Sequence, residues 1–230
     1  MPARRHATIV GIIALLAAVY AVQVFADDAV IERLGLVPAE IAGAWQSLLA
    51  GEAPLASLPT WSTMLTCAFV HGGVEHLLLN MVFLWAFGVL ASEHLSAALA
   101  LAVFVLTAIC GSVMHVLLNP GSDVPTIGAS GAVCGFEGLY LGLALRWELD
   151  WPDVWPLAHP IPPLQLAAFG VLGFGFDVYG VMNHAVGIAF GGHIGGFVSG
   201  FVIAGALTAV YPSGASLARS WMGRREKQRR

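Results

Sequence analysis

The sequence predicts an all-α polytopic membrane protein, a bundle of six transmembrane helices. The first observation is composition, since 58% of the 230 residues are hydrophobic, only 10% are charged, and the mean hydropathy is +0.80. Soluble domains carry about 25% charged residues. The second is a series of six apolar stretches, each near the length that crosses a bilayer. The third is the spacing of glycines in two of them, which is typical of closely packed membrane helices.

The first apolar stretch, residues 7–26, follows Arg4 and Arg5. Its end, Val24-Phe25-Ala26, resembles a signal-peptide cleavage site, but the apolar run is longer than the about 7–15 residues of a signal-peptide core. We therefore predict a retained transmembrane helix. Residues 27–70 then form a long connection outside the membrane, and a connection of this length usually has its own packing or a functional role.

The remaining helices are predicted at residues 74–92, 96–118, 129–147, 163–182 and 187–210. The loop 119–126 contains two prolines and a glycine and cannot be regular helix. Such backbone at membrane depth is tolerated only inside protein or beside a wet cavity. The link from Trp147 to Pro163, rich in tryptophan and proline, is expected at the surface.

Charge predicts the orientation. Nine of the ten Lys and Arg residues fall on one predicted side, in the N-terminus (1–6), the link after the fourth helix and the basic tail (211–230), with Arg33 alone on the other. The positive-inside rule places both termini in the cytoplasm, around a membrane domain at 7–210. The basic residues lack interleaved aromatics, so we expect no nucleic-acid partner. Three cysteines in apolar surroundings indicate packed thiols rather than disulfides.

Two glycine stripes organise the chain. One follows Ser130 through Gly131 and three later glycines, and the other runs through Gly192, Gly196 and Gly200. At about 100° per residue each set shares one helix face. If the fourth and sixth helices pack along these faces, Ser130 and His193 meet near the start of both.

A serine needs a base to become a useful nucleophile, and a histidine takes and returns that proton. We predict a catalytic pair, Ser130 and His193. Glu137 lies two turns deeper than Ser130, about 10 Å along the axis, and is expected beside Ser199 or Gly200. Asp177 is expected near the outer surface. Neither carboxylate is therefore predicted to complete a triad.

A tetrahedral oxyanion needs hydrogen-bond donors. The backbone N–H of Ser130, at a helix N-terminus, is one. His76 and Asn80 share a face of the second helix and are predicted to supply two more. Polar groups at membrane depth are costly and usually face an interior site.

Three motifs carry a family resemblance. They are His71-Gly-Gly-x-x-His76-x-x-x-Asn80, Gly128-Ala-Ser130-Gly131, and Gly192-His193-Ile-Gly-Gly196. In this order, and on these helices, they resemble the rhomboid intramembrane serine proteases over about residues 55–205.

The resemblance implies a six-helix rhomboid-like bundle that hydrolyses peptide bonds in transmembrane protein substrates within a lipid bilayer, without a cofactor or metal. It implies a Ser130–His193 dyad, with His76, Asn80 and the Ser130 amide as the oxyanion hole. Gly128 would lie in the same backbone turn and His71 would help to hold water. Gly131 and Gly196 would support the helix contact. The compact core suggests a bacterial inner membrane; the oligomeric state is left open.

The sequence departs from the family at three places. The family often has Trp-Arg in the first loop, where this chain has Trp61-Ser62. An aromatic residue commonly stacks on the catalytic histidine at the position of Cys134, and Glu137 replaces an apolar residue. None of these removes a catalytic group.

Three other classes of protein remain as alternatives. A transporter predicts internal repeats, and no convincing one is found. A haem or metal protein would use residues such as His71, His76, His115 and His193, but these are not spaced three or four apart on a helix. A catalytically inactive rhomboid-like protein that binds membrane proteins remains the main alternative.

Overall fold

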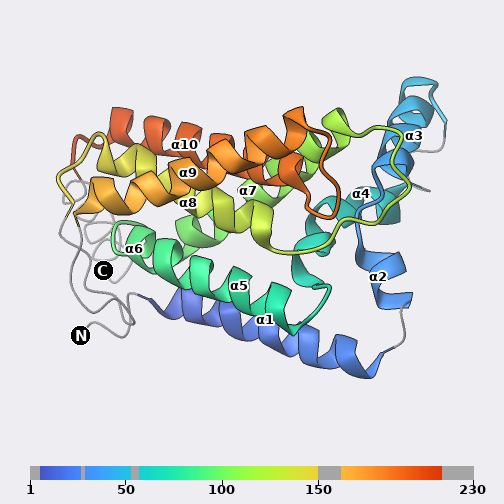
Figure 1. Ribbon diagram of the computed structural model, residues 1–230, viewed down its shortest axis with the longest axis horizontal. Helices are drawn as coiled ribbons and strands as arrows, with labels where there is room; N and C mark the ends of the chain where they lie inside the picture. Colours follow the sequence, from blue (N-terminus) through green and yellow to red (C-terminus); the bar gives the residue numbers. More distant parts are fainter. Residues whose placement is uncertain (1–5, 27–28, 53–56, 150–161, 214–230) are drawn as a thin grey trace, which may run out of the picture.

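The computed structural model describes residues 6–26, 29–52, 57–149 and 162–213. Expectations for the N-terminal residues 1–5, for link residues 150–161 and for the tail from 214 fall outside these ranges. The main helices lie side by side in one bundle (Figure 1). They are α1 (Ala7–Phe25), α5 (Val74–Phe83) continued by α6 (Val89–Ser92), α7 (Ala97–Leu118), α8 (Ser130–Ala144), α9 (Pro163–Met182) and α10 (Phe190–Val210).

Five segments of the described chain are long and apolar enough to span a membrane, namely α1, Val74–Ser92, α7, α9 and α10. The remaining predicted helix, the fourth along the chain, is α8, which has only 15 residues and ends at Ala144, short of the predicted 147. A shorter helix is enough here because the non-helical segment before Ser130 already runs into the bundle (Figure 1). The protein is thus an integral, multi-pass, all-helical membrane protein.

The second predicted span is one continuous rod with an irregularity. Between α5 and α6, residues Leu84–Gly88 form a π-helical turn. Such turns are rare inside helices and are often found near functional sites. Here the turn packs against α1, where Ile9 contacts the Cα of Gly88 so closely that a Cβ would lie 3.1 Å from its methyl group.

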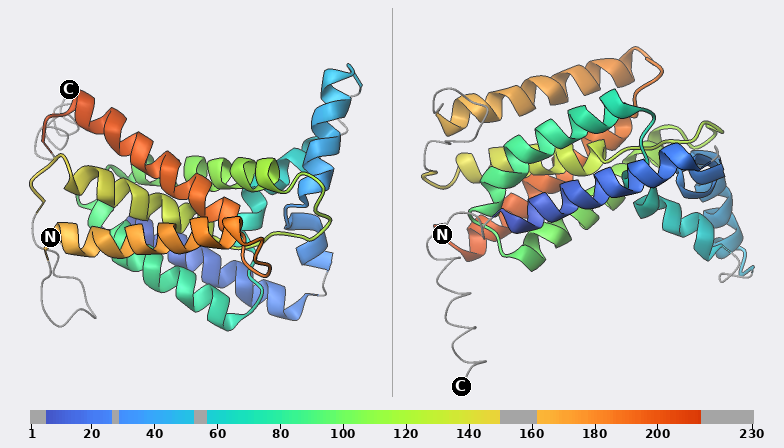
Figure 2. Two further views of the ribbon diagram at one scale, coloured as in Figure 1. Left: turned by 45° about the horizontal axis from the view of Figure 1, so that its top comes forward. Right: turned by 90° about the horizontal axis from the view of Figure 1, so that it is seen from below.

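The predicted long connection folds into three short helices, α2 (Ala29–Leu34), α3 (Pro38–Leu49) and α4 (Leu58–Thr66). They gather at the end of the bundle where α8 begins (Figures 1 and 2). Leu36 and Thr126 exchange backbone hydrogen bonds of 2.9 and 2.8 Å. Leu36, Ile41 and Cys67 form a small buried apolar cluster beneath them. The connection is therefore hydrogen-bonded to the loop segment that leads to Ser130.

The glycine stripes form the contact that was predicted. A Cβ on Gly196 would overlap the carbonyl of Gly131, and one on Gly200 would overlap the carbonyl of Gly135. Without side chains at these positions, the backbones of α8 and α10 touch directly. We call this contact the glycine seam; it continues deeper, where Gly142 meets Ala204.

The core surrounds α8. Phe136, Leu139 and Leu143 of this helix are fully buried, as is Phe104 of α7. α1 begins, and α10 ends, at the same end of the bundle (Figure 1). An even number of crossings has this consequence, and the charge argument assigns that end to the cytoplasm as a prediction.

Candidate active site

Ser130 and His193 meet at the end of the glycine seam where α8 and α10 begin. Ser130 is the first residue of α8, and His193 lies in the first turn of α10. The distance from Ser130 Oγ to His193 Nε2 is 2.8 Å. The two side chains are neighbours because the seam aligns the two helix starts, with Gly131 against the carbonyl of Gly192. The sequence prediction that they come together is confirmed in geometry.

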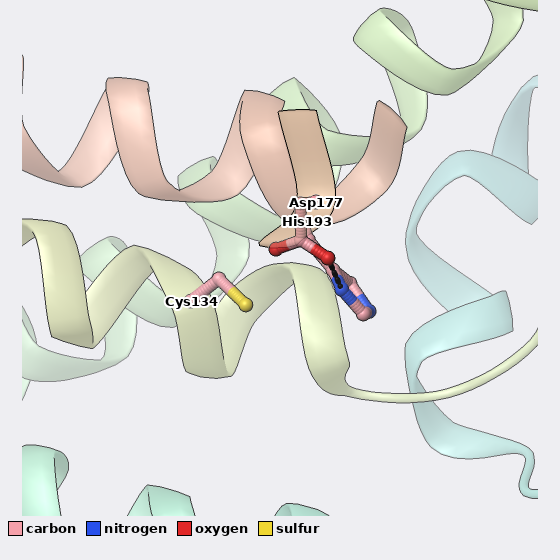
Figure 3. A group of neighbouring side chains, drawn as sticks. All are labelled: Cys134, Asp177 and His193. Carbon is pink, nitrogen blue, oxygen red and sulfur yellow. Dashed lines mark hydrogen bonds and ion pairs between the residues drawn. The ribbon is translucent and has the colours of Figure 1, made fainter. Parts of the chain in front are cut away.

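Asp177 holds the other nitrogen of the same ring. Its Oδ1 lies 2.8 Å from His193 Nδ1, and the residue is only 6% exposed (Figure 3). The expectation that Asp177 lies near the outer surface, away from His193, is wrong. The carboxylate accepts a hydrogen bond from Nδ1–H, which leaves the lone pair of Nε2 free to accept a hydrogen bond from the Ser130 hydroxyl.

This pairing had a signal in the sequence. Asp177 lies five residues before the end of α9, at Met182, and His193 lies three residues after the start of α10, at Phe190. In an antiparallel helix pair with a short loop, residues at similar distances from the loop lie at similar depth. Depth was therefore predictable, although the rotation of α9 that points Asp177 inward was not.

His76 and Asn80 lie on the opposite wall from Asp177. The His76 ring packs on Gly128, where a Cβ would lie 2.6 Å from two ring atoms. Gly128 has φ +118°, a conformation that favours glycine. The Asn80 amide is buried, with its nitrogen 2.8 Å from the His76 carbonyl oxygen. Both side chains line the same cavity as Ser130.

His71 is completely buried before α5. Its Nε2 accepts a hydrogen bond of 3.4 Å from the backbone N–H of Ala129, the residue before Ser130. Among the described residues, its Nδ1 has no hydrogen-bond partner. Burial, with a further contribution from His76, lowers the pKa of His71 to about 4. His71 is therefore neutral at pH 7, and it braces the turn that carries the serine.

A cavity of about 740 Å³ joins these groups. Its walls come from α5, α8, α9 and the loop before α10. A second cavity of about 410 Å³ shares Gly72, His76 and Ile127 with it and is lined by loop polar groups that include Asn119, Ser122 and Thr126. His115, expected at the interface, lines this second cavity, and its Nε2 lies 2.9 Å from Thr126 Oγ1.

A family model of the rhomboid domain matches residues 59–210, about two thirds of the chain. The chain belongs to the rhomboid family. Rhomboid protease GluP of Bacillus subtilis (strain 168) is 30% identical over 147 residues, which are 64% of this chain and 26% of that protein. The putative rhomboid protease YdcA of the same organism is 28% identical over 181 residues, 78% of this chain and 85% of that protein.

A plant relative is also similar. RHOMBOID-like protein 7 of Arabidopsis thaliana is 30% identical over 149 residues, 65% of this chain and 43% of that protein. The chain thus spans about a quarter of the first of these relatives and most of the second. All three relatives are rhomboid proteins by name, as the motifs of this chain predict.

The departures from the rhomboid pattern have structural counterparts. Trp61, in the first loop, packs edge-on against Trp45, with ring centroids 6.2 Å apart. Cys134 replaces the usual aromatic residue one turn after Ser130, and its sulfur points into the space beside Asp177 (Figure 3). Where the family pattern has a stacking ring, this chain has a 2.8 Å hydrogen bond that the Asp177 carboxylate accepts from His193 Nδ1.

Glu137 lines the main cavity on α8. Its carboxylate faces α9, where a Cβ on Gly170 would lie 3.7 Å from Oε2. From the sequence we expected Glu137 beside Ser199 or Gly200, on the α10 side. The phase of α8 turns it instead toward the glycines Gly170 and Gly173, which leave room for a carboxyl group.

Proposed function

We propose that this rhomboid is an intramembrane serine endopeptidase that hydrolyses peptide bonds in or near transmembrane segments of membrane proteins. The observation that carries the proposal is the 2.8 Å contact between Ser130 Oγ and His193 Nε2, at the wall of a cavity large enough for an extended peptide segment. The nucleophile is Ser130, the general base is His193, and Asp177 orients that base.

The chemistry follows from these positions. His193 Nε2 takes the hydroxyl proton as Ser130 attacks the scissile carbonyl, and the imidazolium is stabilised by the Asp177 carboxylate. The oxyanion meets the Ser130 backbone N–H at the start of α8. His76 and Asn80, which line the same cavity, supply further donors after a small rotation of the Asn80 amide. His193 then returns the proton to the leaving amine, and water hydrolyses the acyl-enzyme.

Water must reach a site inside the membrane. The second cavity offers a route, because its polar loop residues surround a space that borders His76. The buried, unpaired Nδ1 of His71 supports the role in holding water that the family resemblance implies. The substrate must unwind locally, because a helix hides its peptide bonds, and weak helix formers near the cut reduce that cost.

The membrane orientation belongs to the same proposal. With both termini in the cytoplasm, α8 and α10 run inward from the outer face, and the site lies nearer the outside. A bacterial inner membrane suits this arrangement, and the two B. subtilis relatives are consistent with it.

The test compares the intact protein with Ser130→Ala on a single-span model substrate in liposomes, with and without EDTA. We expect cleavage by the intact protein, its loss in Ser130→Ala, and no effect of EDTA. Folding is checked by the melting temperature of both proteins. If the folded intact protein cleaves none of several substrates, the alternative holds, namely an inactive rhomboid-like protein that binds membrane proteins.

A further inference from the structure

Three metal-binding side chains converge beside the proposed base. The ligand atoms of Cys134, Asp177 and His193 all lie within 4.8 Å of one another (Figure 3). They come from three different helices, α8, α9 and α10, and all three residues line the main cavity. A thiol, an imidazole and a carboxylate are the ligand types that zinc takes in proteins.

The spacing is close to that of a tetrahedral ion. Bonds of about 2.0–2.1 Å to nitrogen and oxygen and about 2.3 Å to sulfur separate neighbouring ligand atoms by about 3.3–3.6 Å. The Asp177–His193 pair, now 2.8 Å apart, would open by about 0.5 Å at this geometry. A rotation of the Cys134 side chain brings the sulfur into range. The fourth position faces the cavity, where water completes the shell.

We propose that Cys134, Asp177 and His193 bind a thiophilic transition-metal ion such as Zn²⁺, and that this binding inhibits the enzyme. The binding part stands on these three side chains alone. The inhibition part rests on the proposed protease function.

Inhibition follows from the proton on His193. In the active form Nδ1 carries the proton and donates it to Asp177, while Nε2 accepts from Ser130. When the metal takes Nδ1, the neutral ring carries its proton on Nε2 instead. Nε2 then has no lone pair for the Ser130 hydroxyl. The thiol proton of Cys134 leaves to solvent, so each ion bound releases one proton.

The first experiment measures inhibition by Zn²⁺ in detergent, using protein without a polyhistidine tag and a substrate that lacks cysteine and histidine. The variants are Cys134→Ser and, as a matched control, Cys110→Ser, whose thiol is exposed on α7. Each rate is divided by that of the same variant without metal. We expect reversal by EDTA, an inhibitory concentration at least about ten-fold higher in Cys134→Ser, and no change in Cys110→Ser.

The second experiment measures binding without catalysis. Co²⁺ is added to the Ser130→Ala protein, and near-ultraviolet absorption reports thiolate-to-cobalt charge transfer. We expect a band that is lost in Ser130→Ala/Cys134→Ser and kept in Ser130→Ala/Cys110→Ser. A band without any proteolysis by the intact protein contradicts the protease and leaves the metal site standing. Absence of the band, or equal zinc inhibition with and without Cys134, overturns the metal site.

Discussion

Asp177 faces His193 on the next helix and is almost completely buried there, with its Oδ1 2.8 Å from His193 Nδ1. If it orients His193, Asp177→Asn should lower kcat by about two to four orders of magnitude, because an amide can donate to Nδ1 and favour the wrong tautomer. KM should change little. The measurement is the cleavage rate over a range of substrate concentrations and pH values.

Glu137→Gln is the matched control for that change, since Glu137 lines the same cavity and undergoes the same replacement of a carboxyl group by an amide. We expect a far smaller effect on kcat. A rate for Asp177→Asn within two-fold of the intact enzyme, at every pH, would mean that Ser130 and His193 need no carboxylate.

His76 and Asn80 are assigned to the oxyanion by position. Each single alanine substitution should lower kcat by about 10²–10³-fold, as the loss of one oxyanion donor commonly does. Steady-state rates of the two variants check this, with Leu78→Ala as a control on the same helix, because Leu78 is exposed and does not line the cavity. Full activity in either variant would remove that residue from the oxyanion hole.

His71 makes stability depend on pH. Its pKa is near 4 in the folded protein and about 6.5 when unfolded, so the unfolded chain binds more protons between these values. Its contribution is fully present above pH 6.5 and is lost as the pH falls toward 4, by at most about 1.4 kcal/mol per unit. Melting temperatures from pH 7 to 4.5 should fall less steeply in His71→Gln. Parallel curves for the two proteins would refute the assignment.

At the scale of single residues, the glycine stripes predicted that Ser130 and His193 meet, and the four-residue spacing of His76 and Asn80 placed both on one helix face. Asp177 was missed because its helix is apolar on all sides and has no periodic pattern that reveals its rotation. That Cys134 lies close to Asp177 and His193 was missed for the same reason.

At the scale of the helices, the glycine seam determines where Ser130 and His193 lie. Gly200→Ala places a methyl group against the carbonyl of Gly135, and overpacking of this kind costs about 1–3 kcal/mol. A lower melting temperature and lower activity are expected, because α10 must move and carries His193 with it. Gly205→Ala is the matched control, since a Cβ there meets nothing within 4 Å. Equal melting temperatures for the two variants would show that the seam tolerates a side chain.

The helix positions were predictable from hydropathy, and the seam from glycine spacing. The π-helical turn at Leu84–Gly88 was not, because it depends on contact with α1. The shortness of α8 was not predictable either, because the length of this helix depends on how deeply the preceding loop segment enters the bundle.

For the molecule as a whole, composition was enough to predict a multi-pass helical membrane protein. The start of α1 and the end of α10 lie at the same end of the bundle (Figure 1), as an even number of crossings requires. What composition could not predict is how residues 29–52 and 57–66 pack. Their three short helices are stabilised by contacts with distant segments, such as the backbone pairing of Leu36 with Thr126.

One contact joins α1 to the candidate active site. The Gln23 side-chain amide of α1 makes two hydrogen bonds to the backbone of His71. Its Nε2 donates to the His71 carbonyl oxygen at 2.7 Å, and its Oε1 accepts from the His71 backbone nitrogen at 3.1 Å. α1 lies outside the region that the rhomboid model matches. A chimera that grafts residues 59–210 behind another protein's first helix would therefore inherit every motif and still leave the His71 peptide groups unpaired, unless the new helix brings an amide to the same place.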